Sequence, residues 1–148
     1  MSEFSQTLRA AVAAAEPRLR AISEAAACAA PSDPQAWSKK QELGHLVDSA
    51  TNNRVRFIRA ALDGEFAGPS YDGPGWVRMG GYATMPWAEI VTLWKSLNQA
   101  LAIVVAAVPP ERLPAQCRVG KGSAVTLEFL IDDYIRHMNH HLAHITAA

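Results

Sequence analysis

The chain has 148 residues, 49% of them hydrophobic, so we expect a single domain over residues 1–148 with a substantial buried core. Fourteen basic and fourteen acidic residues cancel without a long run of either sign. This argues against nucleic acid as a partner, because phosphate binding requires clustered Lys and Arg. The stretch MSEFSQTLRA lacks a signal-peptide pattern, and no unbroken apolar run reaches the ~18 residues of a membrane span. We therefore expect a cytoplasmic protein with no membrane partner, in which Cys28 and Cys117 are free buried thiols.

In chain order, the first predicted helix covers about residues 3–28. Its apolar side chains recur at three- and four-residue steps: Phe4, Leu8, Ala11, Ala15, Leu19 and Ile22. Pro17 lies inside this pattern and is expected to kink or restart the helix, since proline removes a backbone donor. The stretch APSDPQ then breaks the chain.

The second predicted helix begins at Ser38, because Ser38 followed by Gln41 three residues later is a capping-box pattern. Its apolar stripe consists of Leu43, Leu46, Val47, Ala50, Phe57, Ile58 and Ala61. Gly64 is expected to end this helix after Asp63. Residues 64–84 contain six of the nine glycines, so we expect a long irregular segment of the kind that is usually functional or mobile.

The third helix is predicted from about Pro86, which suits a first helical position, to the pair Pro109–Pro110. The connection 109–124 contains VGKGS but lacks the glycine spacing of a phosphate-binding loop. The fourth helix is predicted from about Thr126 to Ile145. Four amphipathic helices of this length indicate an all-α protein, a four-helix bundle, and no segment alternates in the manner of a strand.

Four of the five histidines lie within the twelve residues YIRHMNHHLAHI of the last helix, and the fifth is His45. His137 and His141 are four residues apart and share one helical face, and His140 and His144 form a second such pair. Helical phase places the first pair at the edge of the apolar stripe, which favours it for a partly buried metal site. A third ligand would be needed, but His45 lies opposite the apolar stripe of its own helix. Histidines on a solvated helix face therefore remain the main alternative.

Three segments resemble the DinB-like superfamily, in particular its YfiT-like branch: WSKKQELGHLVDSATNNRVRF (37–57), LWKSLNQALAIVVAAVPPERL (93–113) and TLEFLIDDYIRHMNHHLAHI (126–145). The resemblance implies a four-helix bundle with up-down-down-up topology, commonly a homodimer. It also implies a divalent metal ion, nickel or zinc, held by His45, His137 and His141. His140 and His144 match positions that are usually not ligands.

Three protein ligands leave coordination positions open, which is typical of a catalytic rather than a structural metal. Such a site can lower the pKa of bound water and deliver hydroxide, or it can bind a thiol as thiolate. The family includes metal-dependent hydrolases and enzymes that transfer a low-molecular-weight thiol, such as bacillithiol or mycothiol, to an electrophile. The YfiT-like pattern favours thiol transfer to a small-molecule substrate. Hydrolysis is the first alternative, and a non-catalytic metal-binding or sensing protein is the second.

Weaker roles follow for a few further residues. Asn52 and Arg56 share a face with His45 and are candidates for binding an anionic substrate, although an ordinary surface pair is an equal alternative. Tyr71 and Trp76 are candidates to close over the same cleft, with capping of the core as their alternative. Asp133, four residues before His137, is expected to be an exposed acid rather than a partner of the imidazole. Trp87 and Trp94 are assigned to packing in the core or at a dimer contact.

Overall fold

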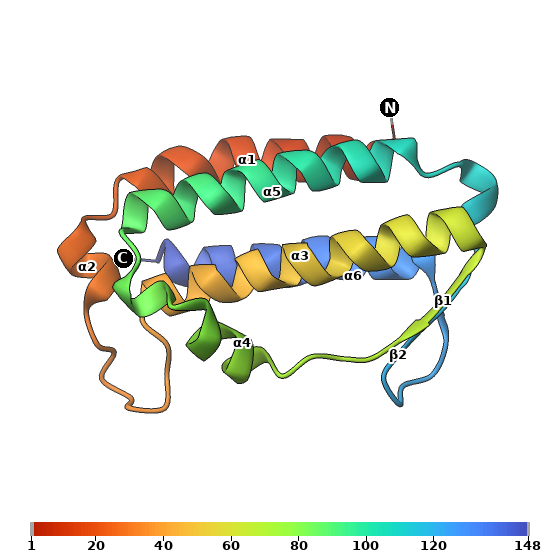
Figure 1. The fold of residues 1–148 in the computed structure, drawn as a ribbon. Coiled ribbons are helices and arrows are strands. Elements are labelled where there is room, and N and C mark those ends of the chain that lie inside the picture. Colours follow the sequence, from red (N-terminus) through yellow and green to blue (C-terminus); the bar gives the residue numbers. More distant parts are fainter. Residues whose placement is uncertain (1, 148) are drawn as a thin grey trace.

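The computed structural model describes residues 2–147 and contains four long helices. They are α1 (Glu3–Arg20), α3 (Lys39–Asp63), α5 (Trp87–Ala107) and α6 (Leu127–Ile145). In Figure 1, α1 and α6 run in one direction, and α3 and α5 run in the other. This arrangement confirms the expected four-helix bundle with its up-down-down-up order.

The ends of the helices next to the histidines are fixed by side-chain caps. Ser38 Oγ accepts a hydrogen bond of 3.3 Å from the Gln41 backbone, while Gln41 Oε1 accepts one of 3.0 Å from the Ser38 backbone. Gly64 ends α3 with a φ of 81°, a left-handed conformation that glycine adopts at little cost. Thr126 caps α6 by accepting a bond of 3.0 Å from the Phe129 backbone. These caps set where α3 begins and ends and where α6 begins.

The first expected helix, 3–28, is divided in the structure. The helix α1 continues through Pro17 but stops at Arg20, and a short helix α2 (Glu24–Cys28) follows. Ser23 causes the restart, because its hydroxyl accepts a hydrogen bond of 3.1 Å from the Ala26 backbone. The apolar period alone did not reveal this break. Cys28, the last residue of α2, is exposed, so the expectation of a buried thiol is wrong for Cys28, whereas Cys117 is buried.

The expectation of an irregular segment over 64–84 and of no strands is wrong. This segment forms β1 (Glu65–Gly68), the helix α4 (Gly73–Gly80) and the 3₁₀ turn η1 (Tyr82–Thr84). Further on lie the 3₁₀ turn η2 (Pro110–Arg112), β2 (Gln116–Val119) and β3 (Val125–Thr126). The strands form one sheet in the order β1-β2-β3, in which β1 and β2 pair parallel and β2 and β3 pair antiparallel.

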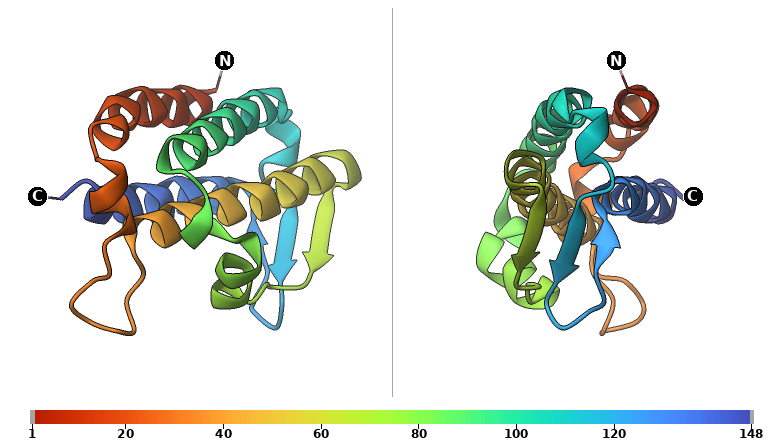
Figure 2. Two further views of the ribbon diagram at one scale, coloured as in Figure 1. Left: turned by 60° about the vertical axis from the view of Figure 1, so that its left-hand side comes forward. Right: turned by 90° about the vertical axis from the view of Figure 1, so that its right-hand side faces the viewer.

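The elements lie in three layers. Figure 1 shows α1 and α5 on one side of the pair α3 and α6, with α4 and the strands on the other side. Both views in Figure 2 show the same order, with the sheet beside one end of the bundle. The largest side chains of the core fill the space between the helices: Trp94, Phe57, Ile90, Leu101, Ile131 and Met138 are all at most 1% exposed.

Of the described residues, one helix has the length and composition needed to cross a membrane. This helix is α5, which passes by its mean hydropathy although polar residues interrupt its apolar run. In the structure α5 packs against α1 and α3. Trp94 of α5 is fully buried, and Asn98 accepts a hydrogen bond of 2.5 Å from the Tyr134 hydroxyl of α6. Core packing therefore accounts for much of its apolar surface.

Candidate metal centre

The structure brings His45 of α3 together with His137 and His141 of α6. Each of the three residues contributes one ring nitrogen, and these three nitrogens all lie within 4.8 Å of one another. His45 Nε2 is 3.3 Å from His137 Nε2, and the centroid of the His45 ring is 5.0 Å from that of His141. The four-residue spacing on α6 and the packing of α3 beside α6 produce this cluster.

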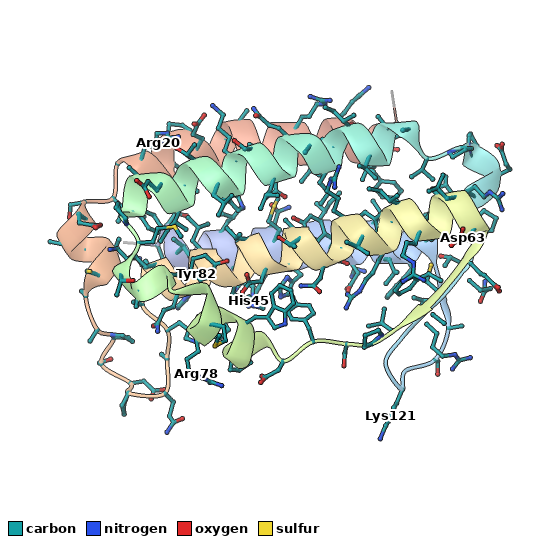
Figure 3. All side chains as sticks on the ribbon, viewed as in Figure 1. Arg20, His45, Asp63, Arg78, Tyr82 and Lys121 are labelled. Atoms are coloured by element: carbon teal, nitrogen blue, oxygen red, sulfur yellow. The ribbon has the colours of Figure 1, made fainter. Side chains whose placement is uncertain are left out.

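His45 occupies the layer between α3 and α4, where it is labelled in Figure 3. The ring of Trp37 lies on one side of it, with 5.0 Å between the ring centroids. The first turn of α4 lies on another side, because a Cβ at Gly73 would be 3.9 Å from His45 Nδ1. The face of α3 opposite its apolar stripe is therefore covered by α4 and is not plain solvent-facing surface.

The chemistry of this cluster fits a divalent ion. Burial and the neighbouring imidazoles of His137 and His141 lower the pKa of His45 to about 4. Burial, followed by the charge of His141, also lowers the pKa of His137. These two imidazoles are therefore neutral near pH 7, and the neutral form is the one that binds metals. The buried His45 Nδ1 has no hydrogen-bond partner among residues 2–147, so no hydrogen bond outside the cluster competes for this ring.

Glu42 is a contributor to this centre that the sequence analysis missed. Its carboxylate is 2.8 Å from His141 Nδ1 and 2.6 Å from His144 Nδ1. Burial tends to raise the pKa of Glu42, but the hydrogen bonds from the two imidazoles outweigh burial and hold the pKa below its ordinary value. Glu42 lies three residues before His45, which places both side chains on the same side of a helix. This spacing was the feature of the sequence that could have identified Glu42 as a neighbour of the cluster.

The two outer histidines differ in their surroundings. His140 is exposed, as expected. The side chain of His144 is 72% exposed, yet its Nδ1 atom reaches Glu42. Asp133 is also exposed and lies 3.8 Å from Arg136, with no hydrogen bond to an imidazole, in agreement with its expected surface position.

The other candidate cleft residues form a separate group further along α3. Arg56 lies over the ring of Tyr71, with 5.7 Å between its Cζ atom and the ring centroid, and the Tyr71 and Trp76 rings are 5.5 Å apart. Arg56 also donates a long hydrogen bond of 3.5 Å to the Pro69 carbonyl. The side-chain amide of Asn52 donates to the Asp48 carbonyl of its own helix at 2.9 Å, so one of its two N–H groups is already used.

A pocket of about 610 Å³ opens beside α4, within the size range of small-molecule sites. Its lining includes Asp48, Trp76 and Met79. Asp48 is one helical turn beyond His45, although none of the three histidines of the cluster lines this pocket. Trp76 lines this pocket, whereas Arg56 and Tyr71 do not.

Three comparisons relate this chain to known proteins. The chain matches the model of the DinB superfamily over residues 7–145. It is 27% identical over 112 residues to a protein of Halalkalibacterium halodurans named "Putative metal-dependent hydrolase"; this match covers 76% of the chain and 65% of that relative's length.

Two solved structures share the fold. YfiT from Bacillus subtilis, described as "a probable metal-dependent hydrolase with an unusual four-helix bundle topology", matches with a TM-score of 0.84 and 22% identity, over 99% of this chain and 86% of YfiT. A mycothiol-dependent maleylpyruvate isomerase matches with a TM-score of 0.79 and 14% identity, over 99% of this chain and 60% of the isomerase. At these identities the two structures establish the fold alone.

Proposed function

Because the chain belongs to the DinB superfamily, we propose that it is a metal-dependent enzyme that transfers a low-molecular-weight thiol to a small electrophilic substrate. His45, His137 and His141 are the proposed ligands of the ion. The observation that carries the proposal is the convergence of their ring nitrogens within 4.8 Å from two helices. Nitrogen ligands of this kind suit zinc and nickel.

The number of ligands favours a reactive centre. Three imidazoles leave coordination positions open, and all three rings are only partly buried. A divalent ion at such a site supplies Lewis acidity, which lowers the pKa of a thiol or water molecule that it binds. The chain's own residues hold the three nitrogens in place and cover His45 with α4, while the adjacent pocket offers Trp76 and Met79 as apolar contacts for a substrate.

Two observations support a thiol rather than water as the nucleophile. The mycothiol-dependent isomerase has the same bundle, so this fold accommodates thiol-dependent chemistry. In addition, both carboxylate oxygens of Glu42 are occupied by imidazoles, so this carboxylate beside the cluster is not free to act as a base. A coordinated thiol is deprotonated outright and needs no further base, whereas hydrolysis commonly uses one.

Hydrolysis is the second candidate function. The relative from Halalkalibacterium halodurans and YfiT both carry descriptions as metal-dependent hydrolases. The open positions of a three-histidine centre serve water as well as a thiol, and so the same ligands support both reactions. The two functions differ in whether turnover requires an added thiol.

The test is one untagged, zinc-loaded or nickel-loaded sample assayed against both substrate classes. Chlorodinitrobenzene serves as the electrophile, with and without added cysteine, and p-nitrophenyl acetate serves as the ester. If the protein transfers a thiol, turnover of chlorodinitrobenzene should require both the ion and cysteine. This turnover should be lost in His137→Ala. Ion-dependent ester turnover without any thiol would contradict this proposal and favour the hydrolase.

A further inference from the structure

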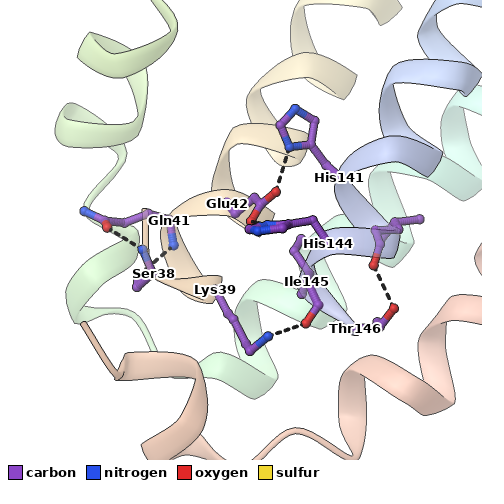
Figure 4. Close-up of polar contacts among 9 residues, drawn as sticks. Ser38, Lys39, Gln41, Glu42, His141, His144, Ile145 and Thr146 are labelled. Carbon is purple, nitrogen blue, oxygen red and sulfur yellow. Dashed lines mark hydrogen bonds and ion pairs between the residues drawn. The ribbon is translucent and has the colours of Figure 1, made fainter. Parts of the chain in front are cut away.

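Glu42 is a buried carboxylate at the meeting point of α3 and α6. It is 6% exposed and lies three residues before His45 on α3. Figure 4 shows its two oxygens directed at two imidazoles from the last turns of α6: Oε2 toward His141 and Oε1 toward His144. One side chain of α3 thus contacts two histidines of α6.

This geometry determines which nitrogen of His141 carries the proton. An ionised carboxylate only accepts hydrogen bonds, so the Nδ1 atoms of His141 and His144 must both donate. In the neutral form, which is the form that binds a metal, His141 then has its lone pair on Nε2. Nε2 is the nitrogen on the side of the ring away from Glu42, and it is therefore available to the cluster formed with His45 and His137.

Among residues 2–147, no lysine or arginine forms an ion pair with Glu42. The two lysines that precede it on α3 bond elsewhere: Lys39 Nζ donates to the Ile145 carbonyl at 2.5 Å, and Lys40 Nζ pairs with Glu24 at 2.8 Å. Among residues 2–147, the ion pairs of Glu42 are those with His141 and His144 alone. A buried carboxylate is costly unless it is paired, so its position is explained by what it does to these imidazoles.

We propose that Glu42 is a positioning residue of the metal centre: it fixes the tautomer and orientation of His141, while His144 occupies its second oxygen. The inference rests on the proposed function in so far as His141 is a ligand. Carboxylates that accept from a ligating imidazole also raise its basicity, and their removal typically lowers metal affinity by about 10- to 100-fold. His144 is thereby a member of the site that does not bind the ion.

The first measurement is zinc affinity, obtained by competition with a chromophoric chelator, for the wild type and four variants. Glu42→Ala is expected to bind zinc about 10- to 100-fold more weakly than the wild type. Glu42→Gln should lose less, because its amide oxygen can still accept from His141 while its amide nitrogen donates to a reoriented His144. His144→Ala should leave the affinity within about threefold, since Glu42 still accepts from His141.

Asp133→Asn is the matched control. Asp133 is a carboxylate one helical turn from His137, but it is exposed and contacts only Arg136 among charged side chains. Removing its charge near the centre should change zinc affinity by no more than about twofold. Equal losses in Glu42→Ala and Asp133→Asn would mean that Glu42 acts only through its charge, and the positioning role would be overturned.

The second measurement is the tautomer of His141, which ¹H–¹⁵N NMR of the imidazoles reports without any ion. The wild type should show a protonated, slowly exchanging Nδ1, and Glu42→Ala should lose this protection. If Glu42→Ala does not fold, Glu42→Met carries both measurements, because it keeps the length of the side chain but has no oxygen that can accept from His141. A wild type that binds no zinc or nickel would refute the proposed function. An unchanged tautomer and affinity in the Glu42 variants would refute only this inference.

Discussion

The Tyr82 hydroxyl donates a hydrogen bond of 2.6 Å to Asp48 Oδ1, which joins the turn after α4 to the middle of α3. Both side chains are 5% exposed. The other oxygen of Asp48, Oδ2, is buried and has no partner among residues 2–147. This pair holds α4 and the following turn against the helix that carries His45, and it has consequences for stability.

The first prediction concerns pH. Burial raises the pKa of Asp48 and outweighs the opposing effect of the Tyr82 hydrogen bond. A carboxyl group whose folded-state pKa is raised stabilises the fold below its ordinary pKa of about 4, and this contribution is lost as pH rises through the folded-state pKa. Chemical unfolding of the wild type and Asp48→Asn across this range measures the difference. The stability of the wild type relative to the variant should fall as pH rises from about 4, and a difference that grows with pH would contradict this assignment.

The second prediction concerns Gly44. Alanine in place of glycine usually stabilises a helix by about 0.5–1 kcal/mol. At this position, however, a Cβ atom would lie 2.1 Å from Cδ2 of the Tyr82 ring, which Asp48 holds in place. We therefore expect Gly44→Ala to destabilise the protein by about 1–3 kcal/mol, as overpacking does.

A double-mutant cycle provides the control for Gly44. In a Tyr82→Ala background the obstructing ring is absent, and so Gly44→Ala should become neutral or stabilising. Denaturant unfolding of the four proteins gives the coupling energy. The same loss of stability in both backgrounds would show that Tyr82 is not the reason for glycine at this position.

The long helices were predictable because their signals are local. Ser38 and Gln41 lie three residues apart and bond to one another, and Gly64 ends α3 by its own backbone conformation. The third proposed ligand, His45, was not predictable from helical phase, because it lies opposite the apolar stripe of its helix. The resemblance to a family supplied that residue, and the structure supplies the reason: α4 covers this face.

The missed features depend on segments that are distant in sequence. The strand β1 pairs with β2 about fifty residues later, and each contains only four residues, too few for a clear alternation. Glu42 lies outside the apolar stripe and looks like a solvent-facing acid, yet it is buried because His141 and His144 lie over it. Such burial follows from packing between helices and not from the order of residues within one helix.

The third prediction concerns the ion and stability. An ion held by His45 and two residues of α6 joins helices that are distant in sequence, so it stabilises the folded state by mass action. In the reference sample, free zinc is present at about 100 times its Kd. Removing this zinc should lower the Tm by about 5–10 °C. Circular dichroism should show that the helices remain, because the core around Trp94 is independent of the ion. Complete unfolding on mild chelation would contradict this expectation.

The fourth prediction concerns the pH dependence of thiol transfer. A free thiol with a pKa of about 8.5 is mostly protonated near neutral pH, whereas a thiol bound to the ion is deprotonated. The ratio of catalysed to uncatalysed rate with cysteine should therefore be largest below pH 8.5 and should shrink above it. Parallel rate measurements with and without the protein test this, and a ratio that is constant with pH would argue against activation of the thiol.

The most direct test of the central claim is the metal content of untagged protein and of two neighbouring variants, measured by elemental analysis after loading with zinc and desalting. His140→Ala is the matched control, because His140 adjoins His141 on α6 but is exposed and outside the cluster. We expect one ion per chain in the wild type and in His140→Ala, and a loss of bound zinc in His141→Ala. Equal zinc content in the two variants, or none in the wild type, would contradict a metal centre formed by His45, His137 and His141.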